Sequence, residues 1–267
     1  MKKFSLILVL LVSIVLLSSC KNSSNVFDFI LDESYDSFVT MATSADYAPY
    51  EFIEEGSDGK NTVSGVDIEI AKEIARALGK NLRVIHKNFD FLIEDVRSGK
   101  VDFIIAGITP TPSRAEIIDF SKSYYTEESV EQVVLIHEDN AAAYATVESL
   151  NTTGLRVGAQ TGTIQVEFAQ LFTPLATLKA ISDINELMNN LTNKQIDALY
   201  TEGPVADVRI NQGAPFVKIV LDQALDYEGN AIGVKKGNTE LLAVINSVID
   251  QLILENKITE WLSYYSA

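Results

Sequence analysis

The chain has 267 residues and a formal net charge of −16 at pH 7, from 37 acidic and 21 basic side chains. A chain this acidic repels the phosphates of nucleic acids and anionic membrane surfaces, so we expect no nucleic-acid partner. Its one cysteine, Cys20, has no partner for an internal disulfide. Residues 38–267 exceed the usual size of a single hydrophobic core, which indicates two lobes.

The N-terminus has the pattern of an export signal. Lys2 and Lys3 precede an apolar run over residues 4–17, and Leu17-Ser18-Ser19-Cys20 follows. The run is shorter than the roughly 20 residues that a spanning helix needs, and it ends in small residues. We therefore expect a signal peptide over residues 1–19, whose removal takes two positive charges away and brings the formal charge to −18. Residues 20–37 are polar and predict a flexible, solvated tether.

Cys20 resembles the lipobox cysteine of bacterial lipoproteins, which is lipidated and becomes the mature N-terminus. The resemblance implies a lipid anchor, such as palmitate, on the outer face of the cell membrane. An uncleaved N-terminal anchor and a chance cysteine are the alternatives. In each case the body of the protein is expected to be extracytoplasmic.

Strands and helices alternate over the first part of the body. Short apolar runs predict strands over 38–42, 82–85 and 101–105. Apolar residues at helical spacing predict a helix over 66–78, and a second helix is expected over 91–97. This alternation predicts an α/β fold with crossover units and a mainly parallel sheet, which binds ligands at the carboxyl ends of its strands.

A second unit with the same logic begins near residue 130. We expect strands over 132–136, 155–159 and 196–200, with helices over 165–172, 184–191 and from Gly203 onward. The chain then returns through a strand over 231–234. A helix over 241–253 and a final helix containing Trp261 end the chain.

Arg114 stands at an unusual place for a cation. Thr111 suits the N-cap of a helix and Pro112 its first position, so Arg114 falls in the first helical turn. Cations are unfavourable near the positive end of a helix dipole. The arginine is therefore either solvated or facing an anion.

Two turns share one design. Ala106-Gly107-Ile108-Thr109 and Gln160-Thr161-Gly162-Thr163 each follow a strand and precede a helix. Helix-start N–H groups, threonine hydroxyls and an arginine together suit a carboxylate ligand. Each turn alone is most simply an ordinary helix cap, but one turn in each lobe favours a ligand site.

Signatures of catalysis and cofactor binding are missing from the sequence. It contains no Gly-x-Ser-x-Gly elbow, phosphate loop or dinucleotide fingerprint. His86 and His137 are the two histidines, and each is more simply a surface or edge residue than a metal ligand. We expect no catalytic residue, no cofactor and no metal.

Four segments together resemble the extracellular solute-binding proteins of family 3, the polar amino-acid receptors of ABC importers. They are residues 45–52, 65–71, 106–114 with 119–121 and 124–125, and 158–165. The resemblance runs from about residue 38 to the C-terminus. It implies a two-lobed periplasmic-binding-protein-like (type II) clamp, each lobe a mostly parallel sheet flanked by helices.

The resemblance also implies the organisation and the partners. Lobe 1 would comprise residues 38–129 and 231–267, and lobe 2 residues 130–230, joined by two crossover segments with hinges near 127–130 and 227–230. A monomer would bind a free polar or cationic L-amino acid of the arginine, lysine or glutamine type. It would deliver this ligand to the ABC permease.

Roles at single positions follow from the resemblance. Arg114, Thr109 and the amide of Gly107 would bind the ligand α-carboxylate, with Thr163 contributing from lobe 2. Glu202 would bind the α-ammonium, although most relatives have aspartate there. Tyr47 and Phe89 would be aromatic walls. The full expected ligand-binding set is Ser44, Tyr47, Phe89, Ala106, Gly107, Thr109, Arg114, Gln160, Gly162, Thr163, Gln165 and Glu202.

The ligand side chain and the class of activity stay open. Ser44 stands where several relatives for cationic or amide ligands have aspartate, so Asp46, Glu51 or Asp90 would have to supply a distal acid. Aromatic walls favour arginine or lysine, and the serine favours glutamine. The alternatives in function are an amino-acid-sensing domain and a dehydratase-like enzyme on the same clamp. An enzyme needs a general acid or base over its substrate, and the predicted pocket loops offer only Glu202.

Overall fold

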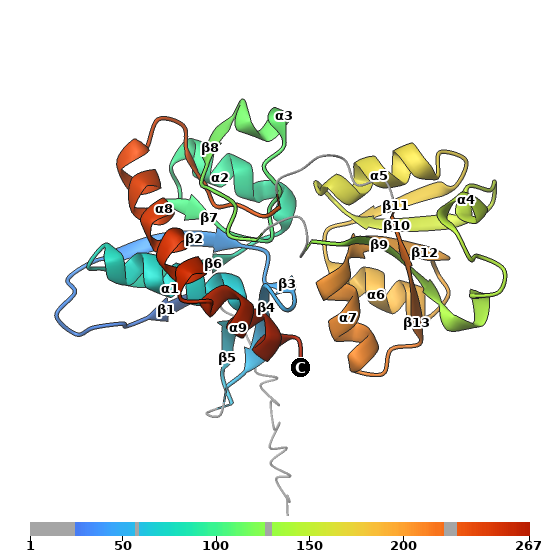
Figure 1. Ribbon diagram of the computed structural model, residues 1–267, viewed down its shortest axis with the longest axis horizontal. Coiled ribbons are helices and arrows are strands. Elements are labelled where there is room, and N and C mark those ends of the chain that lie inside the picture. The colour runs from blue at the N-terminus through green and yellow to red at the C-terminus, as the bar shows by residue number, and fades with distance from the viewer. Residues whose placement is uncertain (1–24, 57–58, 126–129, 222–228) are drawn as a thin grey trace, which may run out of the picture.

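The computed structural model describes residues 25–56, 59–125, 130–221 and 229–267. The expected signal peptide, Cys20 and the start of the tether lie outside these ranges, as do most of the expected hinge near 127–130 and half of that near 227–230. Figure 1 shows two lobes, each with its own central sheet and flanking helices, and the chain crosses between them twice. This confirms the expected two-lobed α/β fold. No helix within the described ranges is both long and apolar enough to cross a membrane.

Lobe 1 is built on a six-stranded sheet in the order β1-β6-β2-β7-β14-β8. Strand β2 pairs in parallel with β6 and β7, whereas β1, β14 and β8 join by antiparallel pairing. The strands are β1 Val26–Phe29, β2 Phe38–Thr43, β6 Asn81–His86, β7 Phe103–Ile104, β8 Ile118–Phe120 and β14 Gly233–Lys235.

Helices and a small sheet complete lobe 1. The helices are α1 Val66–Ala77, the short 3-10 helix η1 Phe89–Phe91, α2 Leu92–Ser98, α3 Pro112–Ala115, α8 Thr239–Leu254 and α9 Lys257–Tyr265. The small antiparallel sheet comprises β3 Asp46–Tyr47, β4 Glu51–Glu55 and β5 Asn61–Ser64. Helix α1 begins after Gly65, whose φ of 125° requires glycine, and a Cβ there would collide with the carbonyl oxygen of Tyr50.

Lobe 2 is built on a five-stranded sheet in the order β11-β10-β12-β9-β13. Its strands are β9 Gln132–His137, β10 Arg156–Gln160, β11 Thr177–Ile181, β12 Ala198–Glu202 and β13 Phe216–Val220. Its helices are η3 Glu138–Asn140, α4 Val147–Leu150, α5 Ile164–Phe172, α6 Ile184–Thr192 and α7 Gly203–Asn211. Strand β10 pairs in parallel with β11 and β12, and β9 runs antiparallel to β12 and β13.

Both sheets are therefore more mixed than the mostly parallel sheets that the sequence predicts. Strands β9 and β14 lie next to the two crossovers, each entering one lobe from the other. A strand that enters from the opposite lobe runs against the strands of the local crossover units. Strand alternation along the chain does not reveal this reversal.

The prediction of a flexible tether over residues 20–37 is partly wrong, because residues 26–29 form an edge strand. Strand β1 pairs antiparallel with β6, and Phe27 and Phe29 pack against the core of lobe 1. Asp28 on the opposite face pairs with Arg83 at 2.7 Å. The side-chain oxygen of Asn81 then accepts the backbone N–H of Leu31 at 2.8 Å. The run Val-Phe-Asp-Phe over 26–29, rich in β-prone residues, is a short strand signal that the polar surroundings mask.

Several short strands also escape sequence prediction, namely β3, β4, β5, β8, β11 and β13. Strands of two to five residues depend on their pairing partners more than on their own propensity. Strand β13, with the sequence Phe-Val-Lys-Ile-Val, does carry a recognisable signal. The other five do not.

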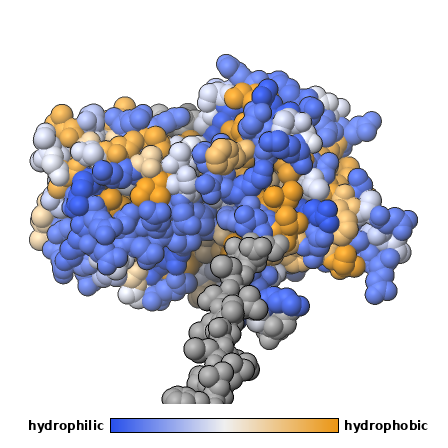
Figure 2. All heavy atoms as spheres, turned by 180° about the vertical axis from the view of Figure 1, so that it is seen from behind, coloured by the Kyte–Doolittle hydropathy of each residue, from blue (hydrophilic) through white to orange (hydrophobic). Residues whose placement is uncertain are grey.

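The hydrophobic cores explain how the lobes meet. Each lobe buries apolar clusters against the faces of its sheet. Tyr47 and Tyr50, which belong to lobe 1 by sequence, pack within a cluster of lobe 2 that includes Leu135 and Val205. The face shown in Figure 2 is more hydrophilic, with hydrophobic areas on both lobes. Apolar contact between the lobes therefore continues into the region where the two predicted turns lie.

Candidate functional site

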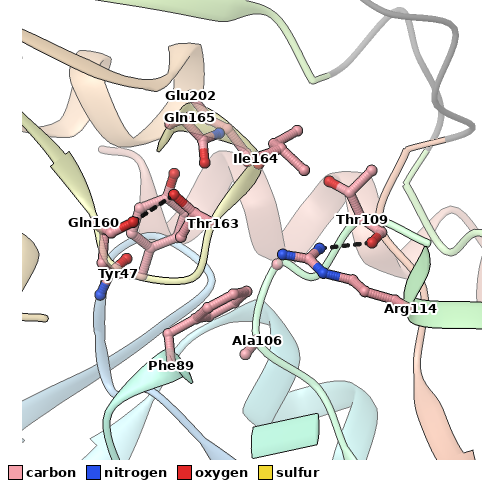
Figure 3. Close-up of a pocket in the computed structure, with 11 residues that line it drawn as sticks. Tyr47, Phe89, Ala106, Thr109, Arg114, Gln160, Thr163, Ile164, Gln165 and Glu202 are labelled. Carbon is pink, nitrogen blue, oxygen red and sulfur yellow. Dashed lines mark hydrogen bonds between the residues drawn. The ribbon is translucent and has the colours of Figure 1, made fainter. Parts of the chain in front are cut away.

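A small pocket lies between the lobes. It is lined by Tyr47, Phe89, Ala106, Gly107, Thr109 and Arg114 from lobe 1, and by Gln160, Thr163, Ile164, Gln165 and Glu202 from lobe 2. Figure 3 shows Glu202 and Gln165 on the opposite side of the pocket from Phe89 and Ala106. Ten of the twelve expected residues line this pocket, whereas Ser44 and Gly162 do not. Ile164 escaped prediction, although its place directly after Thr163 at a helix start is a usable signal.

The Arg114 guanidinium is buried in this pocket rather than solvated. Thr111 caps helix α3 by accepting the Arg114 backbone N–H at 3.3 Å, as the sequence predicts. The side chain is 8% exposed and lies over the Phe89 ring, 5.4 Å from its centroid. Nη1 donates to the Thr109 carbonyl at 2.7 Å (Figure 3), and Nη2 donates to the Gly162 carbonyl of lobe 2 at 2.9 Å. These bonds hold a full positive charge at the pocket wall.

Helix α5 adds to the positive end of the pocket. Thr163 is its N-cap residue, yet no side chain caps the helix, because the Thr163 hydroxyl donates instead to the Gln160 carbonyl at 2.7 Å. Ile164 and Gln165, the first two helical residues, line the pocket. A helix start carries a partial positive charge and N–H donors. Together with Arg114 it suits a carboxylate.

Glu202 supplies the negative end. It ends β12, begins the turn into α7, and is 2% exposed. Burial raises the pKa of Glu202 to about 7, and the nearby charge of Asp67 acts in the same direction. Its Oε2 is buried and accepts no hydrogen bond from the described residues. A buried carboxylate requires an opposite charge, and an ammonium group would provide it.

Aromatic rings form the walls between the charged ends. The Tyr47 ring stacks on Tyr50, with centroids 5.9 Å apart and planes 15° apart. The Tyr47 hydroxyl lies 3.3 Å from the Thr201 hydroxyl of lobe 2. Phe89 forms the second aromatic wall, beneath Arg114. Such faces suit an aliphatic chain or a planar cation.

Three expected contacts differ in the structure. The Ser44 hydroxyl donates to Asp46 at 2.7 Å and does not line the pocket. The Gly162 backbone lies next to Asp90, and the Gly162 carbonyl accepts a hydrogen bond from Arg114. The backbone N–H of Gly107 donates to the buried carboxylate of Asp67 at 2.8 Å, so it is not the free donor for a ligand carboxylate that the resemblance implies. The partner of Ser44 is two residues away, whereas the partners of Gly107 and Gly162 are distant in sequence.

The acids expected to meet a distal cationic group also lie elsewhere. Asp46, Glu51 and Asp90 do not line the pocket, in which Glu202 is the lining acid. Glu51 is fully buried, and its pKa is raised well above the ordinary range, first by burial and then by the charge of Asp67.

The two histidines act as hydrogen-bond acceptors for the backbone. His86 Nδ1 accepts the Ala45 N–H at 2.9 Å, and His137 Nδ1 accepts the Asp139 N–H at 3.2 Å. His137 is buried rather than on the surface. In the part of the chain that the structure describes, no three His, Cys, Asp or Glu side chains are grouped so as to hold a metal ion.

Comparisons with known proteins agree with this geometry. The family model of the bacterial extracellular solute-binding proteins, family 3, matches residues 39–266. The chain is 31% identical to the arginine-binding extracellular protein ArtP of Bacillus subtilis, over 94% of this chain and 93% of that protein. It is similar to an amino acid ABC transporter substrate-binding protein of Streptococcus pneumoniae bound to L-arginine, with a TM-score of 0.80, 31% identity, and coverage of 86% and 94%.

A third similar structure is an ancestral amino acid-binding protein described as a precursor of cyclohexadienyl dehydratase. Its TM-score is 0.77 at 27% identity, and the match covers 86% of this chain and 96% of that one. The family match spans both lobes and every residue that lines the pocket. The chain therefore belongs to the bacterial extracellular solute-binding proteins of family 3.

Proposed function

We propose that the protein binds a free L-amino acid between its lobes and delivers it to the permease of an ABC importer. The observation that carries the proposal is the placement of opposite charges on opposite lobes. Arg114 and the start of α5 suit an α-carboxylate, and Glu202 suits an α-ammonium. Each copy of the chain holds both halves of this site, so the protein acts as a monomer.

Arginine is the proposed ligand, ahead of lysine and glutamine. Tyr47 and Phe89 provide faces on which a guanidinium stacks. Gln160 and Gln165 offer amide groups, which pair with a guanidinium or with another amide. The names of the Bacillus protein and the ligand of the Streptococcus protein support the same choice.

Calorimetric titration of residues 25–267 with the twenty amino acids tests this function. We expect arginine to bind most tightly. Agmatine, which lacks the carboxylate of arginine, serves as the control and should not bind at comparable concentrations. The absence of binding by any amino acid would contradict the proposal.

Binding without chemistry is the second part of the proposal. A dehydratase needs a general acid or base at the reacting bond, and Glu202, the lining acid, is assigned to the ammonium. Incubated with excess protein, each bound amino acid should be recovered unchanged by NMR. Conversion of any of these amino acids would favour the alternative that the protein is an enzyme. The similarity to the ancestral precursor of cyclohexadienyl dehydratase motivates this alternative.

The protein is further proposed to be exported and lipid-anchored at Cys20. Expressed in a bacterium with lipoprotein processing, it should fractionate with membranes, and its N-terminal peptide should begin at Cys20 with diacylglyceryl mass. Replacement of Cys20 by serine should release the protein from the membrane while arginine binding stays unchanged. Membrane association of the serine variant, or an unmodified cysteine, would contradict this assignment.

A further inference from the structure

Asp46 holds the two lobes together away from the ligand pocket. It belongs to β3 of lobe 1 and is 7% exposed. Its carboxylate accepts a hydrogen bond from Ser44 within lobe 1 at 2.7 Å. It accepts two more from lobe 2, from the Gln160 side-chain amide at 3.0 Å and from the Ile184 backbone N–H at 2.9 Å.

The Ile184 contact places a lobe 1 carboxylate at the start of a lobe 2 helix. Ile184 is the first residue of α6, and Asp183 caps the helix in the usual way by accepting the Glu186 N–H at 3.0 Å. Asp46 satisfies a further N–H that the helix itself leaves unpaired. Its charge also interacts favourably with the positive end of the helix.

The Gln160 contact connects Asp46 to the ligand pocket. Gln160 lines that pocket, and its amide nitrogen is shared between Asp46 and the Ser182 carbonyl. Two other bonds between the lobes, from Arg114 to Gly162 and from Tyr47 to Thr201, come from residues that line the pocket themselves. A third, long bond joins the Asn211 side chain of α7 to the Ser266 carbonyl at 3.5 Å, at the end of α9. Asp46 does not line it, so its effect on a ligand must be indirect.

We propose that Asp46 is a positioning residue that fastens the lobes in contact and sets the orientation of Gln160 and α6. The proposal deepens the proposed function, because it assigns part of the ligand affinity to a residue that the ligand does not touch. The bonding pattern suits a neutral side chain as well as a charged one. In an asparagine variant the amide oxygen can accept from Gln160 and Ile184, and the amide nitrogen can donate to the Ser44 oxygen.

Asp46 lines a second cleft between the lobes. Its lining includes His86 from lobe 1, and Asp183 and Arg209 from lobe 2. Burial raises the pKa of Asp46 to about 6, and the charge of Asp183 acts in the same direction. The bonds from Ile184, Ser44 and Gln160 oppose this shift in pKa, and the other nearby charges are those of Arg209 and Glu51.

The sign of the proton effect follows from the direction of this shift. A pKa raised by contact between the lobes means that the lobes in contact bind the proton more tightly than the lobes apart. Lobe contact therefore takes up a proton near pH 6, and acidification from pH 7.5 to 5 favours contact. Protonation keeps the bonds from Ile184 and Gln160 and removes the cost of burying a charge.

Two variants of the fragment 25–267 separate the bonds from the charge. At pH 5, Asp46→Asn should bind L-arginine at least as tightly as the wild type, whereas Asp46→Ala should bind at least tenfold more weakly than Asp46→Asn, because it leaves the Ile184 N–H unpaired and removes one of the two bonds of the Gln160 amide. Between pH 7.5 and 5 the wild type should gain about tenfold in affinity relative to Asp46→Asn, as a shift of about two pKa units requires. Glu33→Ala, which removes an exposed acid, is the matched control.

A distance measurement tests the fastening without any ligand. The fragment contains no cysteine, so spin labels at Gln251→Cys in α8 and Glu167→Cys in α5 report the separation of the lobes. Asp46→Ala should shift the distance distribution to longer values than Asp46→Asn. Equal distances and equal affinities in the two variants would overturn the proposal. If no amino acid binds, the proposed function fails, and the distances still decide the role of Asp46.

Discussion

We expect replacement of Arg114 by alanine to lower the affinity for every free amino acid by about thirtyfold or more. The guanidinium is buried, is held by two carbonyl oxygens and lies at the pocket wall. Its loss leaves the ligand carboxylate in a buried place without its counter-charge. Truncation of one partner of a buried charge pair costs about 2–5 kcal/mol, and each 1.4 kcal/mol is a tenfold change in affinity. Calorimetric titration with L-arginine at pH 8 measures the loss.

Two further variants make this result specific. Arg114→Lys keeps the charge but not the planar fork of donors, so we expect an affinity between those of the wild type and the alanine variant. Arg97→Ala, which removes an exposed arginine of lobe 1 that pairs with Glu94, should bind like the wild type. Circular dichroism checks that each variant is folded. Unchanged binding by a folded Arg114→Ala variant would show that the carboxylate lies elsewhere.

Glu202 makes the affinity depend on pH. Burial raises the pKa of this carboxyl group to about 7, so near pH 7 about half of it carries a proton. In the proposed site, the ammonium group of the ligand binds the ionised form and displaces the proton. Affinity should therefore fall by about tenfold for each pH unit below 7 and should level off above pH 8.

Glu202→Gln tests this assignment directly. The variant cannot ionise, so the pH dependence that Glu202 contributes should vanish, and at pH 8 the affinity should fall by about a hundredfold or more, because the ammonium group loses its buried counter-charge. The ratio of wild-type to variant affinity at each pH cancels the contributions of other titrating groups, including Asp46. A ratio that stays constant from pH 5 to 8 would place the ammonium elsewhere.

Glu202→Asp addresses the difference between this chain and most of its relatives. The aspartate is one methylene shorter, so it keeps the charge and moves it back from the pocket. We expect this variant to retain the pH dependence and to bind less tightly than the wild type. Comparison of the aspartate and glutamine variants separates the effect of the carboxylate charge on affinity from the effect of side-chain length.

Much of the site is readable along the chain, because its signals are local. Four consecutive residues show both the start of a helix and a cation at an unfavourable place. Thr111 and Pro112 mark the helix start, and Arg114 follows in the first turn. The two glycine and threonine turns each lie between a strand and a helix, and the ends of such elements gather on one edge of each sheet. Six of the residues that line the pocket belong to these local signals, namely Ala106, Gly107, Thr109, Arg114, Gln160 and Thr163. The resemblance to the family, and not these signals, implied Tyr47, Phe89, Gln165 and Glu202.

What the sequence could not reveal depends on partners far apart in the chain. Ser44 was expected to contact the ligand, but it bonds to Asp46, which in turn bonds to groups 114 and 138 residues away. The Gly107 N–H is taken by Asp67, 40 residues away. Caps, periodicity and turn chemistry act over a few residues, whereas each of these bonds depends on how whole elements pack. Tertiary structure alone therefore decides which polar groups face the ligand and which fasten the lobes.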